Sequence, residues 1–299
     1  MDHQVKNIES REQWLELRSK VLTSTDAATL FGLSPYQTMF ELWHKKKDQR
    51  VVTLEENQRM KWGNRLEAAI AAGVAEELKM SVVPMKDFFE IADKRLGSSF
   101  DFCVQDEDAI LEIKNVDSLI YRDQWTEDEA PPHIELQVQF QLLVSGKKKA
   151  YICALVGGND MKLIPRTPDT EIQQEILRRA SVFWQSIDTN NEPKPNYETD
   201  AEYIIRLNQY AEPNKFYTGD VSELRELAKS YKQLSENIKQ LEDTKLAMKA
   251  KMLQIIGDSE KVKESDFSIS AGIVGEKVVS YTSKPYRDFR VFLTKKKEK

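Results

Sequence analysis

The stretch AILEIKNVDS, residues 109–118, decides the fold and raises the question of function. Its apolar residues predict a buried β-strand, in which successive side chains point to opposite faces. Leu111 and Ile113 therefore point one way, whereas Glu112 and Lys114 share the other face. A carboxylate and an ammonium two residues apart on one face are either a surface ion pair or half of a metal-dependent nuclease site.

Helices and strands are predicted on both sides of this strand. Apolar residues at helical spacing predict helices, and short apolar runs between turn residues predict strands. The predicted helices are 10–20, one that begins at a cap at Thr25 or Asp26 and stops at Gly32, and then 38–47, 55–79, 131–146 and 168–187. The predicted strands are 81–92, 96–105, 109–116, 149–158 and 161–167. This order predicts an α/β (α+β) fold with a mixed central sheet flanked by helices.

A Pro- and Asn-rich segment, NNEPKPNY at 190–197, marks a change in the sequence pattern. We expect a folded domain at 1–195 and a C-terminal helical extension with short terminal strands at 196–299. The net charge of −5 is unevenly distributed, because residues 200–299 carry 19 Lys and Arg against 16 Asp and Glu. An acidic protein still binds DNA where basic patches line a groove, so net charge excludes no such partner.

The C-terminal extension contains a heptad-like seam. From Leu224 to Ile255, apolar residues alternate three and four positions apart, and Lys245 is the one break in the pattern. This seam has two interpretations: a helical hairpin packed on its own domain, or a contact surface for an oligomer or another partner.

Composition limits the cellular context and the type of metal site. No apolar run approaches the roughly 18 residues that cross a membrane. The first ten residues, MDHQVKNIES, lack an apolar signal core, so we expect a cytoplasmic protein. Cys103 and Cys153 lie in apolar runs and are expected to be buried thiols. With two cysteines and three scattered histidines, a metal site would use oxygen ligands.

A set of polar residues on successive predicted elements forms a candidate site. These residues are Glu67 on a helix, Asp101 on a strand, Glu112 and Lys114 on the next strand, and Gln137 and Gln141 one turn apart on a helix. Hard cations such as Mg²⁺ take several oxygen ligands, so Asp101, Glu112 and the backbone carbonyl of Ile113 are candidate metal ligands. Lys114 would hold a phosphate oxygen or lower the pKa of an attacking water.

Four blocks of the sequence resemble the YqaJ-like viral recombinase and phage lambda exonuclease family of the PD-(D/E)xK nuclease superfamily. The blocks are LRSKVLTSTDAATLFGLSPYQTMFELWHKK, RMKWGNRLEAAIA, GSSFDFCVQDEDAILEIK and HIELQVQFQLLVSGKKKAYICALVGG. The resemblance implies a restriction-endonuclease-like core. It also implies degradation of double-stranded DNA in the 5′ to 3′ direction with Mg²⁺, for which Mn²⁺ can substitute, leaving single strands for annealing.

The resemblance also assigns roles around the metal site. It places Asp101, Glu112 and Lys114 on the family's catalytic acid, acid and lysine. Glu67 falls on the helix carboxylate that assists at the metal, and Gln137 falls on the glutamine of the motif helix.

A second assignment concerns the end of the DNA. Arg18 falls on the arginine that binds the terminal 5′-phosphate, and Thr25 takes the place of a hydroxyl residue in that pocket, or Ser24 if the register slips by one. Relatives often have Pro before and Gly after the first acid, whereas this chain has Phe100 and Phe102. The turn at Asp101 is therefore expected to differ from that of the relatives.

The resemblance predicts an exonuclease of a phage or prophage recombination system, acting on DNA ends in the bacterial cytoplasm. A homo-oligomeric ring, trimer or tetramer, and a single-strand annealing protein are expected partners, and no membrane is. An endonuclease or DNA-repair nuclease on the same core is one alternative, against which the missing four-cysteine cluster of Cas4-like proteins counts. A catalytically silent DNA-binding or scaffold protein is another, against which the intact acid–acid–lysine set counts.

Two tryptophans and three lysine runs are candidates for DNA contacts, but each has a simpler interpretation. Trp43 and Trp62 are predicted to anchor the core rather than to stack on bases. The lysine runs 45–47, 147–149 and 295–297 are expected to be solvated charge. If they contact phosphates instead, salt should weaken DNA binding.

Overall fold

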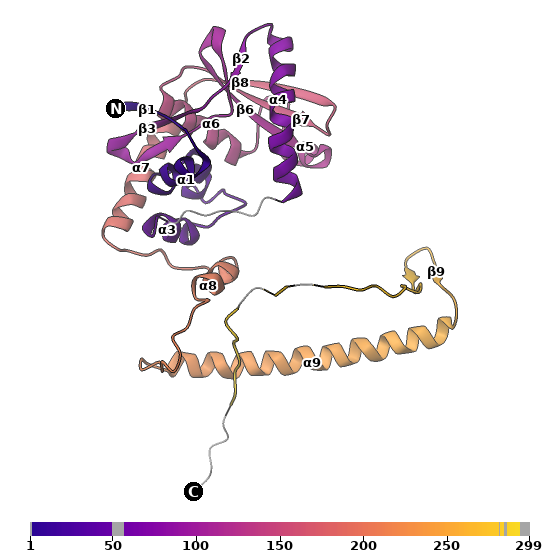
Figure 1. Cartoon of the computed structure of the whole chain (residues 1–299). Helices are drawn as coiled ribbons and strands as arrows, with labels where there is room; N and C mark the ends of the chain where they lie inside the picture. The colour runs from indigo at the N-terminus through magenta and orange to yellow at the C-terminus, as the bar shows by residue number, and fades with distance from the viewer. Residues whose placement is uncertain (1, 50–56, 281, 284–285, 294–299) are drawn as a thin grey trace. The chain divides into compact units, whose positions relative to one another are not determined.

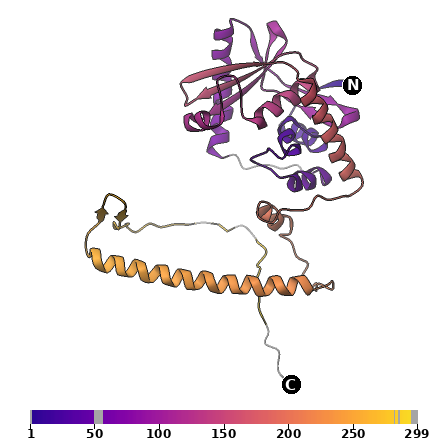
Figure 2. The same ribbon diagram turned by 180° about the vertical axis from the view of Figure 1, so that it is seen from behind.

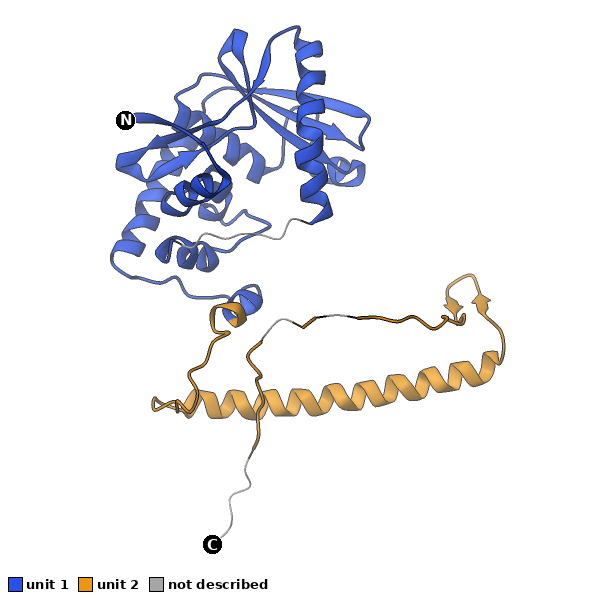
Figure 3. Cartoon of the chain, in the orientation of Figure 1, with its two compact units in different colours: residues 1–204 blue, residues 205–299 orange. Residues whose placement is uncertain are grey.

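The computed structural model describes residues 2–49, 57–280, 282–283 and 286–293. The chain divides into two compact units, residues 1–204 and 205–299 (Figure 3). Every helix in the described ranges is too short or too polar to cross a membrane.

Unit 1 is built on a five-stranded mixed sheet in the order β2-β5-β6-β7-β8 (Figure 1). Its strands are β2 (Val82–Pro84), β5 (Phe102–Val104), β6 (Ala109–Val116), β7 (Ala150–Val156) and β8 (Asp160–Arg166). β6 and β7 are parallel, and the other neighbouring strands are antiparallel. Because parallel neighbours need a crossover, α5 (Ser118–Gln124) and α6 (Pro132–Ser145) connect β6 to β7. The structure confirms the predicted mixed sheet flanked by helices.

A smaller antiparallel sheet and further helices complete unit 1. The small sheet has the order β1-β3-β4, with β1 (His3–Asn7), β3 (Asp87–Ile91) and β4 (Leu96–Ser98). The helices are α1 (Arg11–Lys20), the 3-10 turn η1 (Ser24–Asp26), α2 (Ala27–Leu30), α3 (Met39–Lys47), α4 (Gln58–Leu78) and α7 (Thr170–Asp188), and α8 (Ala201–Leu207) crosses the unit boundary. The predicted helix at 55–79 therefore begins at Gln58, and positions 55 and 56 lie outside the described residues.

Helices cover both faces of the five-stranded sheet (Figures 1 and 2). On one face, Leu111 and Ile113 of β6 pack in a cluster with α4 residues such as Val74. On the other face, Ile110 lies in the larger cluster with α6 residues such as Phe140. This confirms that Leu111 and Ile113 point away from the face on which α6 lies, and β6 therefore presents its polar side chains toward α6.

Two segments that were predicted as single strands each bend between the two sheets. Segment 81–92 contains β2 and β3, and segment 96–105 contains β4 and β5. The bends lie together, because the Met85 N–H donates to the Asp101 carbonyl at 3.1 Å. Phe100 is buried at the bend, in a stack with Phe89. Phe89 and Phe100, which stack at the bend, are both apolar. The alternation of polar and apolar residues along the chain therefore did not reveal the bend.

Unit 2 contains one long helix, α9 (Ser222–Ile256), and a two-stranded antiparallel sheet of β9 (Lys261–Lys263) and β10 (Ser268–Ser270). The helical-hairpin interpretation of the seam is therefore wrong, because the seam lies on a single continuous helix. No Gly or Pro occurs within α9 to break it. The large apolar residues of the seam are exposed.

We expect the core between the sheet and α6 to dominate the stability of unit 1. The Phe140 side chain is fully buried, so Phe140→Ala should lower the free energy of unfolding by about 3–5 kcal/mol, as for other buried Phe→Ala changes. Urea unfolding followed by circular dichroism measures this change. Val182→Ala on the exposed side of α7 is the control, with an expected change within about 0.5 kcal/mol. Equal effects of the two changes would contradict this assignment of the core.

Candidate active site

Glu112 is the centre of a buried polar cluster. Its side chain is 4% exposed. Oε1 accepts hydrogen bonds from Lys114 Nζ at 2.6 Å and from Gln137 Nε2 at 2.7 Å, and Oε2 accepts one from Gln141 Nε2 at 2.6 Å. A buried carboxylate is stable only when it is paired and hydrogen-bonded, and these three residues provide both. The glutamate is therefore held in one orientation.

The two glutamines that contact Glu112 lie on α6, whose two ends are set by the sequence. Pro132 occupies the first turn of α6, and Gly146 ends the helix with a φ of 73°, which favours glycine. Gln137 and Gln141 lie four positions apart and so share a face. That face is turned toward the polar side of β6, where both amide groups donate to Glu112.

Asp101 reaches the cluster from the bend between β4 and β5. The prediction that Asp101 lies in a strand is wrong, because β5 begins at Phe102. The bend lets Asp101 Oδ2 accept a hydrogen bond from the Ile113 N–H at 3.1 Å. Burial, with a further contribution from the negative charge of Glu112, raises the pKa of Asp101 to about 8, although Lys114 opposes this shift.

These oxygen atoms fit a hard divalent cation. Burial and, after it, the charge of Glu112 raise the pKa of Asp101, and a cation between the two carboxylates would favour the charged form of both. The Ile113 carbonyl lies on the same side of β6 as its N–H, and thus on the Asp101 side. In the described part of the chain, no three His, Cys, Asp or Glu side chains form a metal-binding cluster. The groups that would hold an ion here are Asp101, Glu112 and the Ile113 carbonyl, with water or substrate oxygens as its remaining ligands.

Glu67 lies near this cluster without joining its hydrogen-bond network. Its helix, α4, packs on the opposite face of the sheet. Burial and the charge of Glu112 raise the pKa of Glu67, so the two carboxylates are within electrostatic reach. Among the described residues, no hydrogen bond connects Glu67 to Asp101 or Glu112. The role of Glu67 at a metal therefore stays a prediction.

Lys114 remains positively charged in this environment. Burial alone lowers the pKa of a lysine, but here the carboxylates of Glu112 and Asp101 outweigh burial and raise the pKa of Lys114. Nζ also donates to Gln137 Oε1 at 3.2 Å. Lys114 is therefore suited to stabilise negative charge rather than to accept a proton.

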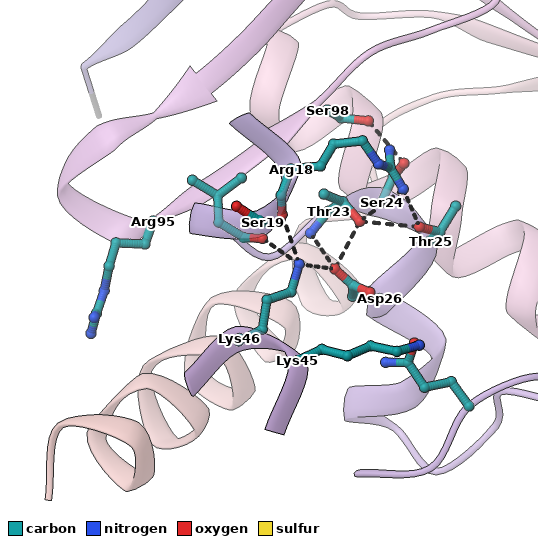
Figure 4. A network of polar contacts seen from close by, with 12 residues as sticks. Arg18, Ser19, Thr23, Ser24, Thr25, Asp26, Lys45, Lys46, Arg95 and Ser98 are labelled. Carbon is teal, nitrogen blue, oxygen red and sulfur yellow. Dashed lines mark hydrogen bonds and ion pairs between the residues drawn. The ribbon is translucent and has the colours of Figure 1, made fainter. Parts of the chain in front are cut away.

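A second polar cluster surrounds Arg18, at the end of α1 (Figure 4). Arg18 Nη2 donates to Thr25 Oγ1 at 2.9 Å and to Thr23 Oγ1 at 3.5 Å. Ser24 is buried, and its hydroxyl accepts a hydrogen bond from Ser98 Oγ at 2.8 Å. Thr25 is thus the hydroxyl residue that contacts Arg18, and Ser24 is not. The contribution of Thr23 was missed, because three adjacent hydroxyl residues look alike in the sequence.

A single cavity of about 400 Å³ connects the two clusters. Thr25 of the Arg18 cluster lines it, and so do Lys114 and Gln137 of the Glu112 cluster. Tyr36 and His133 form another part of the wall, with their rings 6.0 Å apart and nearly perpendicular. The sequence did not indicate these two residues, because Tyr36 lies in the segment before α3 and His133 in the first turn of α6, and neither belongs to a motif of its own.

Several aromatic and basic residues differ from their predicted environments. Trp43 is buried as expected, but Trp62 is 52% exposed and lies beneath the Arg65 guanidinium. The prediction that Trp62 anchors the core is therefore wrong. In the run 45–47, Lys46 is buried rather than solvated.

Lys147 and Lys149 form ion pairs with Asp108 and Glu107 at the surface. The run 295–297 lies outside the described residues. Both cysteines, Cys103 and Cys153, are buried free thiols, as predicted.

Comparison with known proteins shows what this chain is similar to. The chain is 27% identical over 266 residues to the uncharacterized protein YqaJ of Bacillus subtilis (strain 168), a match that covers 85% of this chain and 81% of that protein. The crystal structure of an alkaline exonuclease (LHK-Exo) from Laribacter hongkongensis has a similar fold, with a TM-score of 0.50 and 20% identity over 66% of this chain and 97% of that chain. A family model, the YqaJ-like viral recombinase domain, matches residues 13–148 of this chain.

Proposed function

We propose that this protein is a Mg²⁺-dependent exonuclease that degrades double-stranded DNA in the 5′ to 3′ direction for a phage or prophage recombination system. The observation that carries the proposal is the cavity shared by Thr25, Lys114 and Gln137. Thr25 contacts the proposed phosphate-binding Arg18. Lys114 and Gln137 contact the proposed metal ligand Glu112, so this shared space supports the proposal. A nuclease that starts at a DNA end needs a phosphate-binding group and a hydrolytic group at the same nucleotide. The similar fold of the Laribacter hongkongensis protein, described as an alkaline exonuclease, agrees with this proposal.

The residues divide the work between binding and hydrolysis. The Arg18 guanidinium, a planar fork of N–H donors, binds the terminal 5′-phosphate and sets the register of the strand. Lys114 stabilises the negative charge of the scissile phosphate. Gln137 and Gln141 hold Glu112 in a fixed orientation. A divalent cation held by Asp101, Glu112 and the Ile113 carbonyl would supply further charge stabilisation at the phosphate and the leaving oxygen.

Expectations about assembly extend this proposal. By resemblance, we propose a homo-oligomeric ring, trimer or tetramer, that acts on DNA ends in the bacterial cytoplasm and cooperates with a single-strand annealing protein. The exposed apolar seam of α9 is a surface that either contact would use.

The experiment uses two DNA substrates, a 5′-labelled linear duplex and a closed circular duplex, each with Mg²⁺ or with EDTA. Digestion of the linear duplex alone, only with Mg²⁺, is the expected result. Cutting of the circle would favour an endonuclease or repair nuclease on the same core. Loss of neither substrate would favour a DNA-binding or scaffold protein, and equal digestion in EDTA would exclude the metal.

Arg18→Ala should cause a selective loss of activity on 5′-phosphorylated ends. Hydrogen bonds to a charged group contribute about 1.5–3 kcal/mol, so we expect kcat/KM on phosphorylated ends to fall about 10- to 100-fold, with a smaller change on 5′-hydroxyl ends. Arg122→Ala is the matched control, because Arg122 is an exposed arginine paired with Asp123 on α5. An equal fall on both kinds of end would contradict the phosphate-binding role of Arg18.

A further inference from the structure

Lys46 is a buried lysine beside the Arg18 cluster (Figure 4). Its side chain is 8% exposed. Nζ donates to the Arg18 carbonyl at 2.9 Å and to the Val21 carbonyl at 2.7 Å, and it lies 2.9 Å from Asp26 Oδ2. An ammonium has three N–H donors, and these three partners use them all. Lys46 therefore has no donor left for a ligand, and its role is to organise the residues around it.

A directional chain of hydrogen bonds leads from Asp26 to Arg18. Asp26 Oδ2 accepts from the Thr23 N–H at 2.9 Å and from the Thr23 hydroxyl at 2.8 Å. Because the only hydroxyl proton of Thr23 goes to Asp26, Thr25 must be the donor in the 3.0 Å contact between the two threonines. Thr25 Oγ1 then accepts from Arg18 at 2.9 Å. The position of Asp26 thus fixes the hydroxyl against which the guanidinium rests.

The charges in this cluster are unequal. Arg18 and Lys46 carry two positive charges, and Asp26 carries the one negative charge that interacts with both. Burial alone would raise the pKa of Asp26, but Lys46 and Arg18 lower it overall, so the carboxylate stays charged. Lys46 makes the direct ion pair with Asp26. Asp26 is thus largely neutralised by Lys46, and the charge of Arg18 is left for another anion.

We propose that Lys46 and Asp26 are positioning residues that hold Arg18 beside Thr25 and keep its charge available for a terminal phosphate. This inference rests on the proposed function. Without Lys46, Asp26 would be the nearest anion to Arg18 and would compete with the phosphate for the guanidinium. A buried ion pair with only a structural role has no such consequence, because its loss would weaken the fold and reduce activity on every substrate alike.

The test compares kcat/KM on duplexes with 5′-phosphate and with 5′-hydroxyl ends. For Lys46→Met, we expect the ratio of the two values to fall about tenfold, toward that of Arg18→Ala. The variant Lys46→Met with Asp26→Asn removes the competing charge but keeps a side-chain oxygen that can accept from Thr23, so the ratio should recover. In an Arg18→Ala background, Lys46→Met should not change the ratio further. Lys45→Met is the matched control, because Lys45 pairs with Glu41 on the same helix and lies outside this chain of hydrogen bonds.

The results separate this inference from the proposed function. If the unsubstituted protein does not distinguish the two ends, the phosphate-binding role of Arg18 fails. Two results would show that only the positioning role is wrong, provided that the unsubstituted protein prefers 5′-phosphorylated ends. The first is that Lys46→Met keeps this preference. The second is that Lys46→Met loses it and the added Asp26→Asn change does not restore it. Thermal unfolding reports whether each variant folds, and Lys46→Gln, whose amide still donates to a carbonyl, replaces Lys46→Met if that variant does not fold.

Discussion

Glu112→Gln is expected to abolish DNA digestion while unit 1 stays folded. The substitution keeps the shape of the side chain but removes the negative charge that pairs with Lys114 and that would hold a divalent cation. Loss of one preorganised electrostatic group at a site of this kind costs about 10²–10³-fold in rate, and loss of a metal ligand adds to this. We therefore expect kcat on linear duplex DNA to fall by at least about 10³-fold.

The environment of Glu112 explains why the fold should survive this change. Gln141 Oε1 is buried without a hydrogen-bond partner in the described structure, while Gln141 Nε2 donates to Glu112. If the Gln141 amide turns over, its oxygen can accept a hydrogen bond from the new amide at position 112. After this turn Gln141 Nε2 takes the unpartnered position that Oε1 held before, so the number of unpaired buried polar atoms does not rise and the cost in stability is small.

Glu107→Gln is the matched control for this experiment. Glu107 also accepts a hydrogen bond from a lysine, Lys149, at 2.7 Å, but it lies at the surface away from the cavity. We expect Glu107→Gln to digest DNA at the normal rate. A Glu112→Gln protein that unfolds at the normal temperature and digests DNA within a few-fold of the normal rate would refute the site.

The sequence predicted the strand at the centre of the site because its pattern is local. Alternation along β6 places Glu112 and Lys114 on one face, and the helix signals at Pro132 and Gly146 define α6. The contact between the two elements follows from the parallel β6–α6–β7 connection. These features depend on residues close in sequence, so they can be derived without the structure.

The position of Asp101 could not be predicted in the same way. The chain bends at this residue from one sheet to the other, and the bend depends on the contact with Met85 from another segment. The apolar neighbours Phe100 and Phe102 are compatible with a straight strand, which is why one was predicted. Contacts between distant segments, rather than local preferences, decided the outcome.

The surroundings of Arg18 show the same limit for charged residues. Lys46 belongs to a run of three lysines that looks like solvated surface charge, but it is buried because Asp26 and two backbone carbonyls satisfy its donors. Trp62 is the opposite case: it was predicted to be buried, but it is exposed, because helical spacing did not reveal that its side of α4 faces outward. Burial of a single side chain depends on its partners, which the pattern of hydrophobic residues does not identify.

Lys114→Met is expected to reduce DNA digestion about 10²–10³-fold, the usual cost of removing one group that stabilises transition-state charge. Methionine keeps most of the aliphatic length of the side chain but lacks the ammonium that donates to Glu112 and lines the cavity. In Lys114→Arg the positive charge is kept with a different geometry, so activity should be intermediate. Initial rates on linear duplex DNA with saturating Mg²⁺ measure both changes.

The control for Lys114→Met is Lys162→Met, because Lys162 also pairs with a carboxylate two positions away on its strand, Asp160 of β8, but at the exposed surface. Its activity should be unchanged. If Lys114→Met loses activity and Lys114→Arg restores none of it, the ammonium acts through its specific hydrogen bonds to Glu112 and Gln137 rather than through charge. If Lys114→Met is as active as Lys162→Met, negative charge at the phosphate is stabilised elsewhere, and Lys114 serves only to pair with Glu112.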